Sequence, residues 1–276
     1  MPGLPSRAPR ISICIPHWQV RDMMAICLRS IRRNSRRYDL EVIVVDNGSR
    51  DDSLGWLRSL SWIRLLERSE EGVSNWPANV FTAWDLGARE ARGEFFVTMH
   101  SDVFVKRDDW LDPFLREIAM APDVAGAGGW KLTLENSWYR LQKRALGALL
   151  AGAKRTLGRR ARGSFREGHY PRDYCALYRR SVIVGEGLTF RPGSDSITGG
   201  YAIARQLWDR GYQTRMIPLW EIDRRLVHVA HGTAAVSGEK PLNHRAGQRK
   251  AERRANRLMS ERWIEELRHD TALDAA

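Results

Sequence analysis

The sequence predicts an α/β protein built on a doubly wound, mostly parallel sheet with helices on both faces. Short apolar runs rich in β-branched residues alternate with longer segments in which apolar residues recur at helical spacing. Polar clusters directly follow three of the runs, at residues 16–19, 46–49 and 100–102. Because such sheets bind ligands beyond the carboxyl ends of their strands, we expect these clusters to line one crevice.

The first strand is expected from Ile11 to Pro16, where a proline ends a β-branched run. A helix should follow over residues 20–33, and a second strand over 41–46 runs into the turn residues Asn47 to Ser49. The later elements are expected as a helix from Asp51 or Asp52 to Leu60, a strand over 62–67, a helix over 79–91 and a strand over 94–99. Strand, helix and strand in this order form the βαβ unit of a parallel sheet.

The second half of the chain has a more basic character. Residues 137–163 form an amphipathic stretch in which Trp and Leu alternate with Arg and Lys. A solvated helix packed on its apolar side is one interpretation, and contact with an anionic membrane surface or acceptor is another. The tail over 243–268 is again charged and helical, so we expect one domain over residues 1–240 and a C-terminal helical extension over 241–276.

Composition limits the function classes. The 276 residues include 45 Lys and Arg against 33 Asp and Glu, a net charge of +12, which suits a polyanionic partner such as nucleic acid, an anionic membrane or a phosphate-bearing substrate. Three cysteines without C-x-x-C spacing argue against a disulfide framework and a zinc cluster. No apolar run approaches the roughly 20 residues of a bilayer span. Without an apolar leader, we expect a cytoplasmic protein, with peripheral attachment to the inner face of the cell membrane as a further possibility.

Residues at the first two strand ends suit a nucleoside. Asp46 can accept a hydrogen bond from a base N–H or a ribose hydroxyl, while Gly48 lets the chain turn closely. The alternative is that Asp46 only stabilises its turn. Trp18 can stack on a base or simply pack against the protein.

The third cluster, His100 to Asp102, suits a metal ion. A carboxylate and an imidazole two residues apart after a strand can reach one divalent ion, and oxygen ligands suit Mg²⁺ or Mn²⁺. Such an ion neutralises a departing diphosphate. The alternative role of Asp102 is to cap the next helix.

Taken together, these motifs resemble the N-terminal half of family 2 glycosyltransferases, which have the GT-A fold. Their order and spacing match over about the first 105 residues, in the segments Ile11 to Trp18, Val44 to Ser49 with Asp51, Gly87 to Phe95, and Met99 to Val103. The resemblance implies an inverting transfer from a nucleotide-diphosphate sugar to a hydroxyl of a glycan or lipid-linked acceptor. Residues 1–105 would bind the donor, favoured as a UDP-sugar with GDP- and dTDP-sugars as alternatives, and residues 106–240 the acceptor.

The resemblance also implies site residues. The nucleotide sugar is expected against Pro16, His17, Trp18, Asp46, Asn47, Gly48, Ser49, Ser101 and Asp102. His100 replaces the first carboxylate of the D-x-D metal motif, so Asp102 would hold Mn²⁺ or Mg²⁺ alone or with the imidazole, the diphosphate and water. His228 or His231 would complete the ion's shell or bind a phosphate, with a structural role as the alternative.

An inverting transfer needs a general base on the face opposite the leaving group. The resemblance places the acidic pair of the family at residues 199–200, but both of these residues are glycine here. Asp195, a few residues upstream, is the predicted base, and capping of the following helix is its other role. Further candidates are Glu186, Glu221 and Asp173.

A nucleic-acid-binding protein that uses the basic stretches 137–163 and 245–254 is the alternative function. No recognised nucleic-acid motif supports it, and it leaves the strand-end clusters unexplained. Other nucleotide enzymes are disfavoured because neither G-x-G-x-x-G after the first strand nor a phosphate-binding P-loop sequence occurs. No G-x-S-x-G motif supports a hydrolase.

Overall fold

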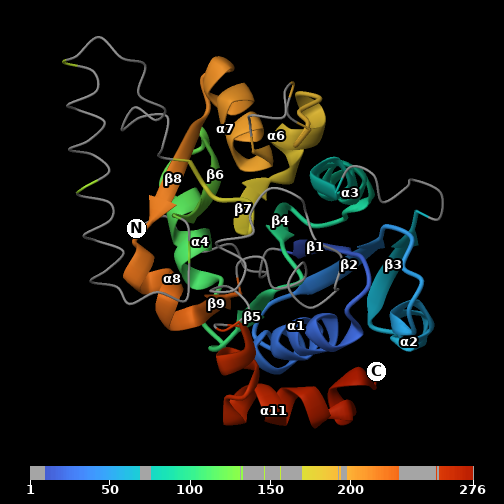
Figure 1. Ribbon diagram of the computed structural model, residues 1–276. Helices are drawn as coiled ribbons and strands as arrows, with labels where there is room; N and C mark the ends of the chain where they lie inside the picture. Colours follow the sequence, from blue (N-terminus) through green and yellow to red (C-terminus); the bar gives the residue numbers. More distant parts are fainter. Residues whose placement is uncertain are drawn as a thin grey trace.

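The computed structural model describes residues 10–68, 76–130, 170–191, 198–229 and 255–275, and also the single residues 132, 146, 156, 193 and 253. Within them, seven strands form a sheet in the order β3-β2-β1-β4-β7-β6-β8 (Figure 1). Strand β7 is antiparallel to both of its neighbours, and every other neighbouring pair is parallel. The predicted doubly wound, mostly parallel sheet is confirmed.

The first four strands of the sheet form where the β-branched runs predicted them. Their bounds are β1 (Ile11–His17), β2 (Leu40–Asp46), β3 (Ile63–Glu67) and β4 (Phe95–Met99). Alternate side chains of β1 enter two different hydrophobic clusters, Ile13 on one face of the sheet and Cys14 on the other. Burial on both faces explains why these strands are continuous apolar runs.

Helices cover both faces of the sheet (Figure 1). One hydrophobic cluster joins the sheet to α1 (Arg21–Asn34), α2 (Ser53–Ser59), α4 (Asp112–Ile118) and α11 (Arg262–His269). The cluster on the opposite face includes α3 (Trp76–Glu90), α6 (Arg180–Gly185) and α7 (Gly199–Asp209). All three cysteines are buried and free.

The second half completes the sheet and adds a smaller one. Strands β6 (Val124–Gly129), β7 (Cys175–Arg179) and β8 (Gln213–Ile217) extend the main sheet, while β9 (Leu226–His228) pairs antiparallel with β5 (Val103–Val105). Between β8 and β9, residues 219–225 form helix α8 (Leu219–Arg225). Glu221 lies in its first turn and Arg225 in its last, so both charges favour the helix dipole.

The C-terminal extension packs on the N-terminal half where the structure describes it. Arg29, on α1, is buried and donates from Nε to Oδ1 of Asp274 at 2.8 Å and from Nη2 to Oδ2 at 2.6 Å. It also donates to the carbonyl of Leu267 at 3.2 Å, near the end of α11, and Trp56 Nε1 donates to Asp274 at 3.1 Å. Asp274 ends the 3₁₀ helix η2 (Thr271–Asp274). These contacts hold the end of the chain against α1 and α2.

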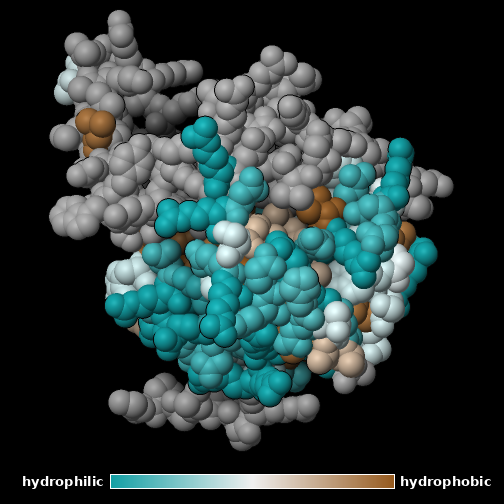
Figure 2. Space-filling view, turned by 60° about the horizontal axis from the view of Figure 1, so that its bottom comes forward, coloured by the Kyte–Doolittle hydropathy of each residue, from teal (hydrophilic) through white to brown (hydrophobic). Residues whose placement is uncertain are grey.

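The side of the molecule that is lowest in Figure 1 comes forward in Figure 2, where its coloured surface is mostly hydrophilic. Among the described residues, no helix combines the length and the apolar character needed to cross a bilayer. The basic stretch 137–163 lies outside the described residues except for positions 146 and 156. Its predicted membrane or acceptor role therefore stays a prediction.

Candidate functional site

Three strand ends meet at one edge of the sheet, as the sequence predicts. Strands β1 and β2 are in register with His17 opposite Asp46. Strands β1 and β4 pair Cys14 with Thr98, so His17 lies level with the residues that follow β4. The polar clusters at 16–19, 46–49 and 100–102 consequently lie side by side.

The carboxylate of Asp46 is buried inside its own turn. Oδ2 accepts the backbone N–H groups of Gly48 at 3.0 Å and Ser49 at 2.9 Å, and Oδ1 accepts the Ser49 hydroxyl. Gly48 has a φ of +83°, a conformation that glycine adopts without steric cost. The Ser49 hydroxyl oxygen in turn accepts the N–H of Gln19 at 2.8 Å. Asp46 thus has the turn-stabilising role, and its nucleoside contact stays a prediction.

His17 and Trp18 are both buried beside this turn. His17 Nε2 lies 2.9 Å from the Ser53 hydroxyl oxygen. Burial lowers the pKa of His17 to about 4, against the opposing effect of Asp46 and Asp51. The imidazole is therefore neutral at pH 7 and connects β1 to the start of α2.

Arg68 is a cation at this edge that sequence reasoning missed. Its backbone N–H donates to the carbonyl of Asp46 at 2.8 Å, and its guanidinium donates to Asn47 Oδ1 at 2.6 Å and to the carbonyl of Asn79 at 3.2 Å. Burial and the nearby Arg191 lower its pKa. Arg68 directly follows β3, so the rule that ligands bind at strand ends could have identified it.

Beside the turn, His100, Asp102 and His228 form a compact cluster. Their potential ligand atoms all lie within 4.8 Å of one another. Asp102 Oδ1 is 3.4 Å from His228 Nε2 and 3.8 Å from His100 Nδ1. The side chain of His100 is 34% exposed, whereas those of Asp102 and His228 are 6% and 10% exposed. The cluster thus has one open side.

His228 reaches this cluster through the small second sheet. It is paired with Val103, and the N–H of Val229 donates to the carbonyl of Asp102 at 2.9 Å. His228 Nδ1 donates to the carbonyl of Leu132 at 3.1 Å, which leaves Nε2 directed at Asp102. The ring of Tyr174 stacks on the imidazole ring of His228, and the two ring centroids are 4.7 Å apart.

His100 has one buried ring nitrogen, Nε2, with no hydrogen-bond partner in the described part of the chain. Burial lowers the pKa of His100, although Asp102 and Asp173 oppose that shift. A neutral imidazole is the form that binds metals, so two imidazoles and one carboxylate here could hold a divalent ion. Asp102 and the buried Ser101 lead into strand β5, so the prediction that Asp102 caps a helix is wrong.

The candidate bases lie in different places. Asp195 lies outside the described residues, as does the possible ligand His231. Glu186 is at the C-terminal end of α6, where its Oε2 pairs with Nε of Arg210 at 3.5 Å. Asp173 accepts the N–H of Gly200 at 3.2 Å and is the carboxylate, after Asp102, that most affects His100.

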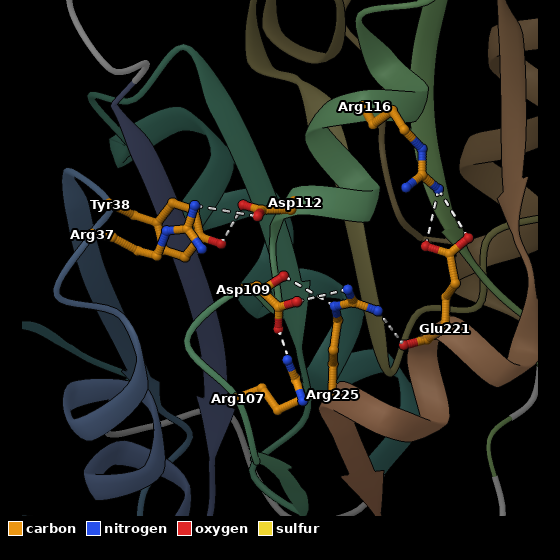
Figure 3. Close-up of polar contacts among 8 residues, drawn as sticks. All are labelled: Arg37, Tyr38, Arg107, Asp109, Asp112, Arg116, Glu221 and Arg225. Atoms are coloured by element: carbon orange, nitrogen blue, oxygen red, sulfur yellow. Dashed lines mark hydrogen bonds and ion pairs between the residues drawn. The ribbon is translucent and has the colours of Figure 1, made fainter.

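Glu221 belongs to a structural ion-pair group. Figure 3 shows Arg116 of α4 directed at both oxygens of Glu221, at 3.1 Å each. On the same side, Arg225 pairs with Asp109 at 2.7 Å. These pairs hold α8 against α4 and its preceding loop, so Glu221 is occupied by stabilising contacts.

Comparisons with known proteins agree with this geometry. The family model described as Glycosyl transferase family 2 matches residues 12–184. The O-antigen biosynthesis protein RfbC of Myxococcus xanthus is 30% identical over 125 residues, which are 45% of this chain. The match spans only 9% of the length of that relative.

Solved structures show the same fold. The mannosyltransferase PcManGT from Pyrobaculum calidifontis, in complex with GDP-Man and Mn²⁺, matches with a TM-score of 0.57 at 16% identity, over 97% of this chain and 74% of that one. S. aureus TarS 1-349 matches with a TM-score of 0.51 at 12% identity, over 91% of this chain and 72% of that one. The fold is GT-A, and the chain belongs to glycosyl transferase family 2.

Proposed function

We propose that this chain transfers a sugar from a nucleotide-diphosphate sugar to a hydroxyl of a glycan or lipid-linked acceptor, with inversion and with a divalent ion. The observation that carries the proposal is the cluster of His100, Asp102 and His228 at the carboxyl end of β4. In an open α/β sheet this is where ligands bind. Family membership supplies the class of reaction.

The donor atoms of the cluster favour Mn²⁺ over Mg²⁺. Mg²⁺ prefers an all-oxygen octahedral shell, whereas imidazole nitrogen suits transition metals. His228 is held by its hydrogen bond to Leu132 with Nε2 directed at Asp102, and His100 Nδ1 also faces Asp102, so the residues fit such an ion. The bound ion would neutralise charge that develops on the departing diphosphate. Mn²⁺ in the related mannosyltransferase structure supports this choice.

For the nucleotide, we propose the surface formed by residues 16–18, the turn 46–49 and Ser101. Arg68 adds a positive charge beside Asn47, which suits an anionic ligand. A UDP-sugar is the first donor to test. A GDP-sugar is the second, since the mannosyltransferase was solved with GDP-Man.

Our proposal for acceptor binding and for the base comes from the sequence alone. Asp195 is the base predicted from the sequence, and His231 the possible further ligand. The basic stretch 137–163 would bring the protein to the inner face of the cell membrane, where lipid-linked acceptors lie. Salt-sensitive binding to vesicles of anionic lipid, reduced by replacing Arg159, Arg160 and Arg162, tests that attachment.

The test of the proposed function is thermal unfolding with UDP, GDP, dTDP or CMP, each with and without Mn²⁺. A ligand that binds only the folded state raises its stability. We expect one nucleoside diphosphate to stabilise the protein, and only when Mn²⁺ is present. Stabilisation by a polynucleotide alone, lost at high salt, would instead support the nucleic-acid function.

A further inference from the structure

The first turn of helix α7 begins with Gly199 and Gly200, and neither position has room for a side chain. A Cβ atom on Gly199 would lie 2.5 Å from the ring of Phe81, and one on Gly200 would lie 2.8 Å from the carbonyl oxygen of Pro171. Because Pro171 belongs to the segment that leads into β7, that segment packs directly against the backbone of α7 at Gly200, while Gly199 packs against α3.

The segment before β7 places the carboxylate of Asp173 at the start of α7. Asp173 Oδ2 accepts the N–H of Gly200 at 3.2 Å, and the hydroxyl groups of Tyr170 and Thr198 lie 2.9 Å apart on the same turn. The N-terminal end of a helix favours negative charge. Asp173 is half-buried, and its second oxygen, Oδ1, makes no hydrogen bond in the described part of the chain.

Asp173 also lies next to the metal cluster without belonging to it. Strands β4 and β7 pair Met99 with Cys175, and one step further the N–H of His100 donates to the carbonyl of Tyr174 at 3.0 Å. The ring of Tyr174 stacks on His228. Asp173 precedes Tyr174, and its charge opposes the lowering of the His100 pKa. The three-residue cluster does not include it, so a second carboxylate borders the site.

We propose that Asp173, and not Asp195, is the general base of the transfer, an inference that rests on the proposed function. Oδ1 of Asp173 takes the proton as the acceptor O–H bond breaks and the acceptor oxygen bonds to C1 of the sugar. The bond from C1 to the phosphate oxygen breaks, and its electron pair leaves with the nucleoside diphosphate. Gly200 is then required because it lets the Asp173 segment approach the helix.

The test replaces the carboxylate without removing its structural contact. In Asp173→Asn, the amide oxygen still accepts the Gly200 N–H, so the fold should persist. Asp209→Asn is the matched control, because Asp209 lies at the other end of α7 and its side chain is 66% exposed. Asp195→Asn tests the competing base. Nucleotide release from UDP-glucose, UDP-N-acetylglucosamine, GDP-mannose and dTDP-glucose is measured with Mn²⁺, first with water and then with azide as acceptor.

Azide distinguishes a base from a structural residue because it attacks C1 without giving up a proton. We expect Asp173→Asn to lower release with water about 10²- to 10⁴-fold, the usual contribution of general base catalysis. Nucleotide-dependent stabilisation should be unchanged. Azide should restore the rate to within about tenfold of the wild type, with the sugar azide as product. Asp209→Asn should match the wild type, and any loss in Asp195→Asn should not be restored by azide.

Three results would overturn the inference. Asp173→Asn could keep its rate with water, or bind nucleotide normally and gain nothing from azide. Alternatively, Asp195→Asn could show both the loss and the rescue, which would place the base there. In each of these cases the wild type still releases nucleotide, so the proposed function stands. A wild type that releases nothing and binds no nucleoside diphosphate overturns both.

Discussion

Two groups of buried polar side chains share one edge of the sheet but differ in whether the protein itself satisfies their hydrogen bonds. In the turn group, Asp46 accepts three hydrogen bonds from Gly48 and Ser49. In the metal cluster, Asp102 faces two imidazoles at 3.4 and 3.8 Å, and His100 has a buried nitrogen without a partner in the described structure. Buried polar groups are normally paired, so the second group has the properties of a metal site.

This difference predicts different consequences of mutation. A side chain that the protein itself satisfies should matter mainly for the free energy of unfolding. A side chain that belongs to a ligand site should matter mainly for binding and turnover. Three substitutions and the pH dependence of stability test this contrast, and we order them from the largest expected effect to the smallest.

Asp102→Asn should have the largest effect. The change removes the only carboxylate of the three-residue cluster, so we expect Mn²⁺-dependent stabilisation to disappear and turnover to fall at least about 10²-fold. The melting temperature without ligands should change little. Thermal unfolding and nucleotide release measure both effects. Retention of metal-dependent stabilisation would remove Asp102 from the site.

His228→Ala should weaken Mn²⁺ binding at least about 10- to 100-fold, which is the usual loss when only the partner that orients a ligand is removed. The effect should be smaller than that of Asp102→Asn because the carboxylate and His100 remain. A titration with Mn²⁺ at saturating nucleotide, followed by thermal unfolding, measures it. His269→Ala is the matched control, since that histidine is 77% exposed on α11. Equal metal affinity in both variants would contradict the prediction.

Asp46→Ala should act mainly on stability. It leaves the N–H groups of Gly48 and Ser49 without their acceptor, and we expect a loss of about 3 kcal/mol in the free energy of unfolding. Urea denaturation measures the loss. A variant with unchanged stability but no nucleotide binding would show that Asp46 contacts the nucleoside after all.

The pH dependence of stability should show the buried His17. Its pKa is about 4 in the folded protein and ordinary, near 6.5, in the unfolded chain. The unfolded state therefore takes up the proton first as pH falls, so stability decreases between pH 6.5 and 4, by about 2 kcal/mol from pH 7 to 5. His17→Gln, which can still bond to Ser53, should reduce this slope. An identical slope in the variant would contradict the assignment.

Much of the fold and part of the site could be predicted because they depend on local patterns. The apolar runs predicted the first four strands, and the polar residues after them predicted the shared edge. The contact of Asp102 with His228 depends on pairing between β5 and β9, which are far apart in the chain. The sequence offered His228 and His231 as alternatives but could not place either.

Other features depend on packing that no local pattern encodes. Residues 219–225 form α8, and its charged side chains Glu221 and Arg225 pair with Arg116 and Asp109, which lie more than 100 residues earlier in the chain. The contact of Asp173 with Gly200 depends on the absence of a side chain at position 200, and a search for acidic residues alone does not reveal it. The link from Arg29 to Asp274 joins residues at opposite ends of the chain.

The most direct test of the central claim is Mn²⁺ binding followed by electron paramagnetic resonance, in which the signal of free Mn²⁺ falls as the ion binds. The wild type and Asp102→Asn are titrated with the nucleoside diphosphate that stabilises the wild type. We expect one Mn²⁺ per wild-type chain and a much weaker site in the variant. Equal binding by both proteins, or none by the wild type, would show that His100, Asp102 and His228 are not a metal site.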